Sequence, residues 1–192
     1  MDKDHLISRR NFLKTASLIG SGFAIGFNFL QAKRELNSEF SPNMYINVLS
    51  DDTVILSVSK AEMGQGIWTS LPMLIAEEME VDWGKVKVQQ ISKDNFIGTG
   101  GSMSISGYGW EKMREAGAVA KQVLVESAAL KWKVSPVECV AKNNVIYHEK
   151  TRQSTSFGSL VDKDYKVKIP KSVKLKKPSE FNLLGKDMLR TD

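Results

Sequence analysis

Short runs of β-forming residues, partly with alternating apolar and polar positions, predict four strands. Residues 45–49 and 53–59 are two such runs, separated by residues 50–52 (Ser-Asp-Asp), and this arrangement predicts a hairpin. Residues 85–91 alternate in the same way, and residues 144–148 form a shorter run. The chain is therefore expected to build at least one sheet.

Two other segments repeat apolar residues at helical spacing. The first begins after residue 66 and has Pro72 in its early turns, where the missing N–H costs little. The second begins at Trp110, and its stripe includes Gly117 among alanines, which predicts a close approach to another backbone. The two apolar stripes are Ile67, Leu71, Leu74, Ile75 and Met79, and then Trp110, Met113, Gly117, Ala120, Leu124 and Ser127 or Ala128.

Two short helices are expected nearer the C-terminus. Ser135 is a candidate N-cap, followed by Pro136 in a first-turn position, so a helix is predicted there. Cys139 would lie inside this helix as a small buried residue. A further short helix is expected from Ser156 to Val161. The element order ββαβαα(β)α predicts an α+β fold with helices packed on one face of a small mixed sheet.

The predicted domain spans residues 44–162. Residues 35–43 are polar and contain a proline, which is typical of a linker. Residues 163–192 are rich in lysine, and between residues 163 and 177 the only aromatic residue is Tyr165. A nucleic-acid site usually interleaves aromatic and basic residues, so this part is interpreted as a solvated, extended connector to a further domain.

The N-terminus has the pattern of a targeting segment. Ser8-Arg9-Arg10-Asn11-Phe12-Leu13-Lys14 precedes an uncharged, glycine-interrupted apolar stretch over residues 15–30. Residues 1–34 resemble a twin-arginine export signal, which predicts a periplasmic protein that folds before export. The apolar run is shorter than the roughly 20 residues that cross a bilayer comfortably. A membrane anchor over residues 12–30 is the alternative, and cleavage of the signal is left open.

The net charge and the small number of cysteines and histidines exclude several classes of function. The chain has 192 residues, of which 42% are hydrophobic and 26% charged, as in globular proteins. Residues 1–34 contain six basic and two acidic residues, hence four of the five net positive charges, so the nearly neutral remainder has no footprint for nucleic acid. With Cys139, His5 and His148 as its only cysteine and histidines, this chain cannot form an internal disulfide, a His/Cys metal centre or an iron–sulfur cluster.

Two glycine-containing loops are the candidate binding sites. The loop over residues 62–66 (Glu-Met-Gly-Gln-Gly) combines close backbone approach, N–H groups at a helix N-terminus and the amide of Gln65. The loop over residues 98–107 alternates hydroxyls with unhindered backbone N–H groups, as anion-binding nests do. Each loop alone is weak evidence, because glycine also serves turn geometry. Both follow a strand and enter a helix, so together they favour a phosphate-bearing cofactor at one edge of the sheet.

Three segments carry a resemblance to a known family. Residues 62–69 (Glu-Met-Gly-Gln-Gly-Ile-Trp-Thr), 76–79 (Ala-Glu-Glu-Met) and 99–104 (Thr-Gly-Gly-Ser-Met-Ser) resemble the molybdopterin-binding subunit of the xanthine dehydrogenase and aldehyde oxidase family. More closely, the chain is similar to the large β subunit of isoquinoline 1-oxidoreductase-type enzymes. The resemblance implies a domain that binds molybdopterin, in its cytosine dinucleotide form, through Gly64, Gln65, Gly66, Gly100, Gly101, Ser102, Met103 and Ser104.

The resemblance also implies partners. In the family, [2Fe–2S] clusters in a small subunit carry electrons away, and a cytochrome c is a further candidate partner. Family large subunits are several times longer and have their general base near the C-terminus. The chain is therefore expected to be an N-terminal portion, either truncated or one half of a split subunit, and inactive alone. It is expected to contribute no catalytic residue: Glu62, Glu77 and Glu78 are interpreted as solvated carboxylates, not as general bases.

The leading interpretation is the cofactor-binding segment of a periplasmic molybdenum hydroxylase that hydroxylates an N-heterocycle or oxidises an aldehyde. The alternative is a non-catalytic periplasmic interaction module that keeps the fold without the cofactor.

Overall fold

A four-stranded mixed sheet is the centre of the fold. The structure, a computed structural model, describes residues 22–26, 45–58, 60–90, 101–161, 167, 169–170 and 172–191. The sheet has the order β1-β2-β3-β4, with antiparallel pairs β1/β2 and β2/β3 and a parallel pair β3/β4. Its strands are β1 (Gly22–Gly26), β2 (Tyr45–Leu49), β3 (Val54–Val58) and β4 (Val86–Gln90). The predicted hairpin and the predicted mixed sheet are confirmed.

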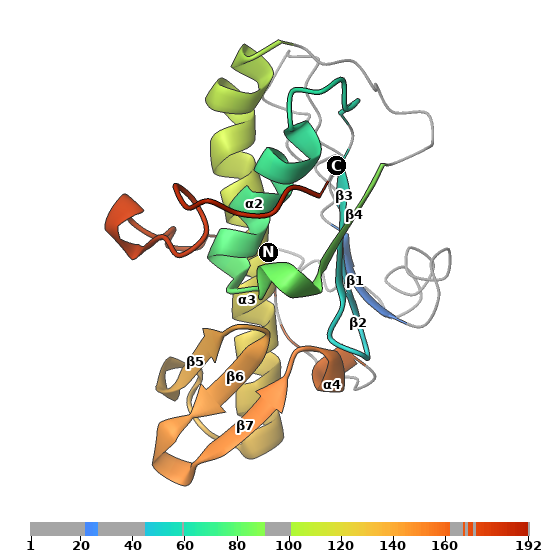
Figure 1. The fold of residues 1–192 in the computed structure, drawn as a ribbon. Coiled ribbons are helices and arrows are strands. Elements are labelled where there is room, and N and C mark those ends of the chain that lie inside the picture. The colour runs from blue at the N-terminus through green and yellow to red at the C-terminus, as the bar shows by residue number, and fades with distance from the viewer. Residues whose placement is uncertain are drawn as a thin grey trace, which may run out of the picture.

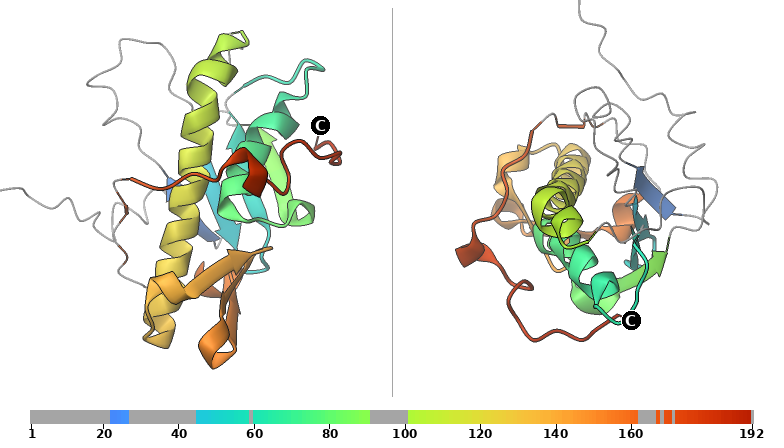
Figure 2. Two further views of the ribbon diagram at one scale, coloured as in Figure 1. Left: turned by 90° about the vertical axis from the view of Figure 1, so that its left-hand side faces the viewer. Right: turned by 90° about the horizontal axis from the view of Figure 1, so that it is seen from above.

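Two helices form the layers beside this sheet. Helix α2 (Ile67–Met79) connects the parallel strands β3 and β4 and packs against both. Helix α3 (Trp110–Trp132) packs along α2, so that α2 lies between α3 and the sheet (Figures 1 and 2). The predicted packing of the helices on one face of the sheet is confirmed.

The core agrees with the predicted stripes. All five apolar stripe positions of α2 are buried, as are the positions of α3 from Met113 onward, whereas Trp110 is partly exposed. Gly117 is the point of closest approach between the helices. A Cβ built on it would lie 2.3 Å from the carbonyl oxygen of Ile75, so only glycine fits there.

A second, three-stranded antiparallel sheet packs at the C-terminal end of α3 (Figure 1). Its strands are β5 (Cys139–Lys142), β6 (Val145–His148) and β7 (Gln153–Ser156), and α4 (Gly158–Val161) follows. The prediction of Cys139 inside a helix is wrong. Residues Pro136–Glu138 form a single 3-10 turn, and the apolar-polar alternation after it continues as β5. The strand β7 was not predicted, because its sequence Gln-Ser-Thr-Ser is polar.

The first strand lies in a segment that was predicted to lie outside the fold, as part of an export signal. Gly22–Gly26 pairs along its length with β2, with Phe23 opposite Val48 and Ile25 opposite Ile46. Part of residues 1–34 therefore belongs to the sheet, whereas Arg9 and Arg10 lie outside the described residues. Among the residues that the structure describes, no helix has the length and apolar character needed to span a bilayer.

Residues 172–191, called the strap below, cross over α2 (Figures 1 and 2). The strap is extended except for a short 3-10 turn at Pro178–Glu180 and a second turn over residues 182–186, closed by a bond from the Lys186 N–H to the Leu183 carbonyl. Its expected solvation is wrong in one essential respect: the Lys176 ammonium is nearly buried and forms ion pairs with Glu77 at 2.6 Å and Glu80 at 2.7 Å. The strap is therefore packed onto the domain.

Candidate functional site

The parallel pairing of β3 and β4 fixes where the two glycine loops begin. Val58 and Gln90 are register partners at the carboxyl ends of the two strands. One loop runs from β3 to the N-terminus of α2, and the other leads from β4 to the N-terminus of α3, with residues 91–100 outside the described residues. Both helix N-termini lie at the same end of the molecule, at the top of Figure 1 and of the left view of Figure 2. Ligands of α/β sheets bind outside this edge.

The carboxylate of Glu62 organises the first loop. Its Oε1 accepts hydrogen bonds from the N–H groups of Gly64 (2.8 Å) and Gly66 (3.0 Å), and its Oε2 accepts one from Trp68 (3.1 Å). These are the groups that the sequence analysis expected to be open to a ligand, and that expectation is wrong. An internal carboxylate already satisfies the N-terminus of α2, as negative side chains do at this position. Glu62 is a capping residue of the loop and not a solvated carboxylate.

The side chain of Gln65 closes the loop and keeps hydrogen-bonding capacity. Its Oε1 accepts the N–H of Met63 at 2.6 Å, and its Nε2 donates to the carbonyl of Ala61 at 2.8 Å. A carboxamide has two N–H donors and two acceptor lone pairs, so one donor and one acceptor remain for another molecule. Gln65 is exposed. At Gly64 and Gly66 the positive φ angles of 92° and 74° are those that glycine adopts without strain.

The second loop passes directly into helix. Gly100 lies outside the described residues, whereas Gly101 has a φ of 64°, and a Cβ built on it meets no heavy atom of the described residues within 4 Å. The carbonyl of Ser102 accepts the N–H groups of Ile105 (3.0 Å) and Ser106 (2.9 Å), so the helix has begun by this point. The predicted loop is thus shorter than expected, and Ser104–Gly109 form a π-helical segment before α3.

The strap returns to the first loop from more than a hundred residues away. The Trp83 indole donates to the carbonyl of Leu189 at 2.9 Å, and Thr191 bonds to the first turn of α2. Between them, the guanidinium of Arg190 lies beside Gly66, with its Nη2 3.8 Å from a Cβ built on that glycine. A cation therefore stands next to the loop that contains the Glu62 carboxylate.

Buried carboxylates on α2 anchor the rest of the strap. Glu77 accepts the N–H groups of three consecutive strap residues, Asn182, Leu183 and Leu184, and the ammonium of Lys176. Burial alone raises the pKa of Glu77, but the hydrogen bonds from Lys176 and the three N–H groups outweigh it, so the pKa is lowered below its usual value. The interpretation of Glu77 as a solvated carboxylate is wrong.

Glu78 is buried beside Glu77, on the side of α2 that faces α3. Its carboxylate accepts the Nε–H of Arg114 at 2.7 Å and the N–H of Lys176 from the strap. The Arg114 guanidinium also lies over the rings of Trp110 and Phe181, at 5.4 Å and 5.1 Å from their centroids. The prediction of a solvated side chain is wrong for Glu78 as well, because its partners come from distant segments.

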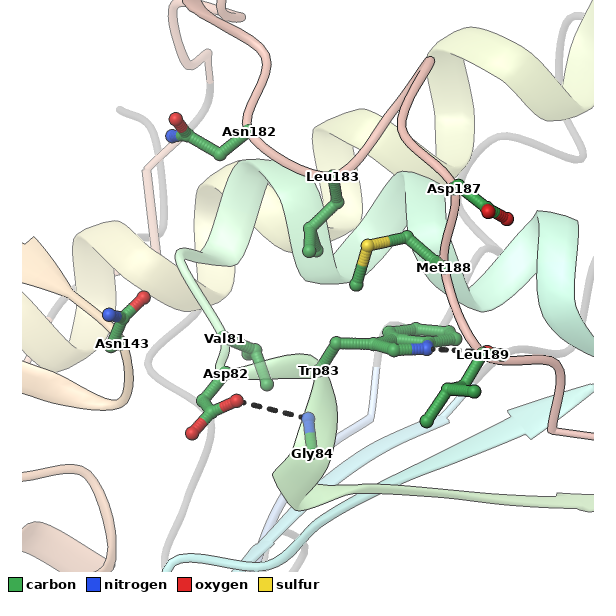
Figure 3. A pocket seen from close by; sticks show the side chains of 10 residues that line it. All are labelled: Val81, Asp82, Trp83, Gly84, Asn143, Asn182, Leu183, Asp187, Met188 and Leu189. Carbon is green, nitrogen blue, oxygen red and sulfur yellow. Dashed lines mark hydrogen bonds between the residues drawn. The ribbon is translucent and has the colours of Figure 1, made fainter.

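A cavity of about 410 Å³ lies between the strap and the turn after α2 (Figure 3). Trp83 and Val81 line it on one side, and Leu183, Met188 and Leu189 of the strap face them. None of the predicted cofactor-binding residues that the structure describes lines it. The candidate site is therefore an open edge with two loops, separate from this cavity.

A separate cluster of titratable groups lies in the small sheet. His148 is buried and bonded to Thr151 and Glu138, and Glu138 also pairs with Lys150. Burial raises the pKa of the Cys139 thiol, which disfavours the reactive thiolate. Among the described residues, no three His, Cys, Asp or Glu side chains gather to hold a metal ion.

The roles of Glu62 as a cap and of Arg190 as a neighbour of the first loop were not predicted from the sequence. An acidic residue shortly before a helix is a recognisable capping signal, so the role of Glu62 could have been predicted. Arg190 has no comparable signal, because its position depends on the path of the strap.

Comparisons with known proteins show the family of this chain. A family model described as the molybdopterin cofactor-binding domain matches residues 6–187. Isoquinoline 1-oxidoreductase subunit beta of Brevundimonas diminuta is 34% identical over 181 residues, which cover 86% of this chain and 23% of that protein. The membrane-bound aldehyde dehydrogenase (pyrroloquinoline-quinone) of Gluconacetobacter polyoxogenes is 30% identical over 205 residues, which cover 96% of this chain and 25% of that protein.

This chain thus spans about a quarter of the length of these relatives. Among solved structures, quinoline 2-oxidoreductase from Pseudomonas putida 86 is similar, with a TM-score of 0.49 and 16% identity over 60% of this chain and 15% of that one.

Proposed function

The chain belongs to the molybdopterin cofactor-binding domain family, and we propose that its two glycine-containing loops bind this cofactor as part of a molybdenum hydroxylase. The observation that carries the proposal is the common origin of the loops at the carboxyl ends of the adjacent parallel strands β3 and β4. The residues proposed to hold the cofactor are Gly64, Gln65, Gly66, Gly100, Gly101, Ser102, Met103 and Ser104.

The described residues at the two loops fit such a group. A Cβ built on Gly64 or Gly101 meets no heavy atom of the described residues within 4 Å, so open space lets a planar heterocycle or a phosphate approach the backbone. Gln65 contributes its remaining donor and acceptor to the polar edge of a pterin. Met63 and Met103 are 70% and 76% exposed, and these side chains can cover the apolar faces of the ring system.

The bound cofactor supplies the redox chemistry for hydroxylating an N-heterocycle or oxidising an aldehyde. The residues of this chain bind and orient it. We propose the cytosine dinucleotide form of molybdopterin and a small partner subunit with [2Fe–2S] clusters, with a cytochrome c as acceptor. Because the chain spans about a quarter of its relatives, we assign the general base and the remaining walls of the site to the rest of the large subunit.

The test is cofactor content. Each variant is co-expressed with its neighbouring gene products, and molybdenum and nucleotide are measured in the purified enzyme. Gln65→Ala should cost about 1–3 kcal/mol of cofactor binding, because it leaves a polar group of the cofactor unpaired. Gly101→Val should lose more cofactor, since a β-branched residue is strained at a φ of 64°.

Gln153→Ala is the matched control, because Gln153 is an exposed glutamine in the small sheet. Its cofactor content should equal that of the wild type, and circular dichroism should show the fold intact in the Gln65 variant. Full molybdenum occupancy in both loop variants would contradict the proposed site.

A non-catalytic periplasmic module is the second candidate, and one observation favours it. The Glu62 carboxylate occupies three N–H groups at the start of the first loop and α2. If this candidate is right, the purified wild-type protein should contain no molybdenum, even when the same host loads molybdenum into its other molybdenum proteins.

We propose export to the periplasm by the twin-arginine route, on the pattern of residues 8–30. Replacing Arg9 and Arg10 together by lysine should retain the protein in the cytoplasm, whereas Arg34→Lys, which lies outside the motif, should leave export unchanged. Cell fractionation and immunoblotting measure how much of each variant reaches the periplasm. Periplasmic accumulation of the double variant at the wild-type level would refute the export proposal.

A further inference from the structure

The strap fixes a cation at the entrance of the first loop. Leu189 is held through its carbonyl by the Trp83 indole, and Thr191 is held by two bonds to the first turn of α2, a 3.0 Å bond from its N–H to Thr69 Oγ1 and a 2.7 Å bond from its hydroxyl to the carbonyl of Trp68. The backbone on both sides of Arg190 is therefore anchored, and its exposed side chain has a defined origin beside Gly66.

Two charged groups lie at the first loop, the Glu62 carboxylate and the Arg190 guanidinium. The Glu62 carboxylate accepts hydrogen bonds from the N–H groups of Gly64, Gly66 and Trp68. Its negative charge therefore offsets the partial positive charge at the start of α2. These three N–H groups are therefore already bonded within the chain. The guanidinium of Arg190, with its Cζ 4.0 Å from a Cβ built on Gly66, is a positively charged group beside this capped loop.

We infer that Arg190 is a binding residue for a phosphate group of the cofactor, delivered to the first loop by the strap. A guanidinium matches a phosphate through two parallel N–H···O bonds, which a lysine ammonium cannot reproduce. The inference rests on the proposed function of the loops. It adds a residue 124 positions after Gly66, and it makes the anchoring of the strap by Glu77 and Glu78 a condition for a complete site.

Protection from chemical modification tests the inference without a variant. The whole enzyme is prepared with cofactor and from a host unable to make it, and both samples react with phenylglyoxal, an arginine reagent. Mass spectrometry then measures modification of each arginine. Arg190 should react several-fold less in the loaded enzyme, whereas Arg152, exposed in the turn before β7, should react equally in both samples. Equal modification of Arg190 in the two preparations, whether high or low, would overturn the inference.

Variants separate this inference from the proposed function. Arg190→Gln should lower cofactor retention by about tenfold, the usual worth of a charge-assisted bond, and Arg190→Lys should retain an intermediate amount. Lys186→Gln removes an exposed charge elsewhere on the strap and should have no effect. If Arg190→Gln keeps its cofactor while Gln65→Ala and Gly101→Val lose theirs, the inference is wrong and the proposed function stands. If all three keep it, the proposed function fails as well.

Discussion

Gly117 shows how a single residue sets the distance between two helices. A Cβ at this position would lie 2.3 Å from the Ile75 carbonyl oxygen and 3.1 Å from the Glu78 Cβ. Both neighbours belong to the buried face of α2, which cannot move without disturbing the sheet. The sequence predicted this contact, because a glycine among alanines on an apolar stripe is typical of helices whose backbones approach closely.

The stability of Gly117→Ala tests this contact. Alanine is the better helix former by about 1 kcal/mol, but the clash should outweigh that gain and lower the free energy of unfolding by roughly 1–3 kcal/mol. Gly107→Ala is the control, because Gly107 precedes α3 in open space. Urea unfolding of the purified proteins measures the free energy of unfolding of both variants and of the wild type. Equal stability of Gly117→Ala and the wild type would show that the helices have room to separate.

The acidic residues of α2 show where reasoning from local sequence stops. Glu77 and Glu78 were interpreted as solvated, because charged helix residues usually are. The partners in the strap, among them Lys176 and Leu183, lie about a hundred residues later in the chain, and Arg114 lies 36 residues after Glu78. No local pattern connects such groups, so their burial is visible only in the folded molecule.

At the scale of elements, the strap depends on ionised anchors. The pKa of Glu77 is lowered in the folded state, so its contribution is complete above the ordinary carboxyl value of 4.5 and is lost as the pH falls through the lowered pKa. Burial lowers the pKa of Lys176, but its bonds to Glu77 and Glu80 outweigh burial and raise it overall. The contribution of Lys176 is therefore present below 10.5 and is lost as the pH rises through the raised value.

Amide hydrogen exchange of the strap tests this dependence. The N–H groups of Asn182, Leu183 and Leu184 should be protected at neutral pH and should lose protection in acid, after correction for the intrinsic exchange rate. Glu77→Gln should remove most of the protection at neutral pH, whereas Glu126→Gln, on the surface of α3, should not. Protection that persists in Glu77→Gln would mean that the strap is held by its other contacts.

Local periodicity predicted the elements that have it. The strands β2, β3 and β4 and the helix α2 were located within one or two residues, and so was the start of α3, because each element has one face toward the core. The strand β7 has no apolar face to reveal it. A proline after a serine suggested a helix before β5, but the chain makes only one 3-10 turn there, since the alternation that follows suits a strand.

At the scale of the molecule, one topological fact creates the candidate site. The connection β3-α2-β4 makes two strands parallel and adjacent, so the loops that follow them leave from the same edge of the sheet. The order of elements allowed this arrangement to be predicted. The capping of the first loop by Glu62 and the approach of Arg190 were not predicted, because they depend on side-chain placement and on the path of the strap.

Comparative hydrogen exchange of the whole enzyme with and without its cofactor tests the central claim most directly. The claim is that the two loops at this edge hold the molybdopterin cofactor. Loading should slow exchange in peptides that cover residues 61–66 and 101–106, while peptides from β5 to β7 exchange alike in both samples. Unchanged exchange in both loops of a preparation shown to contain stoichiometric molybdenum would contradict the account.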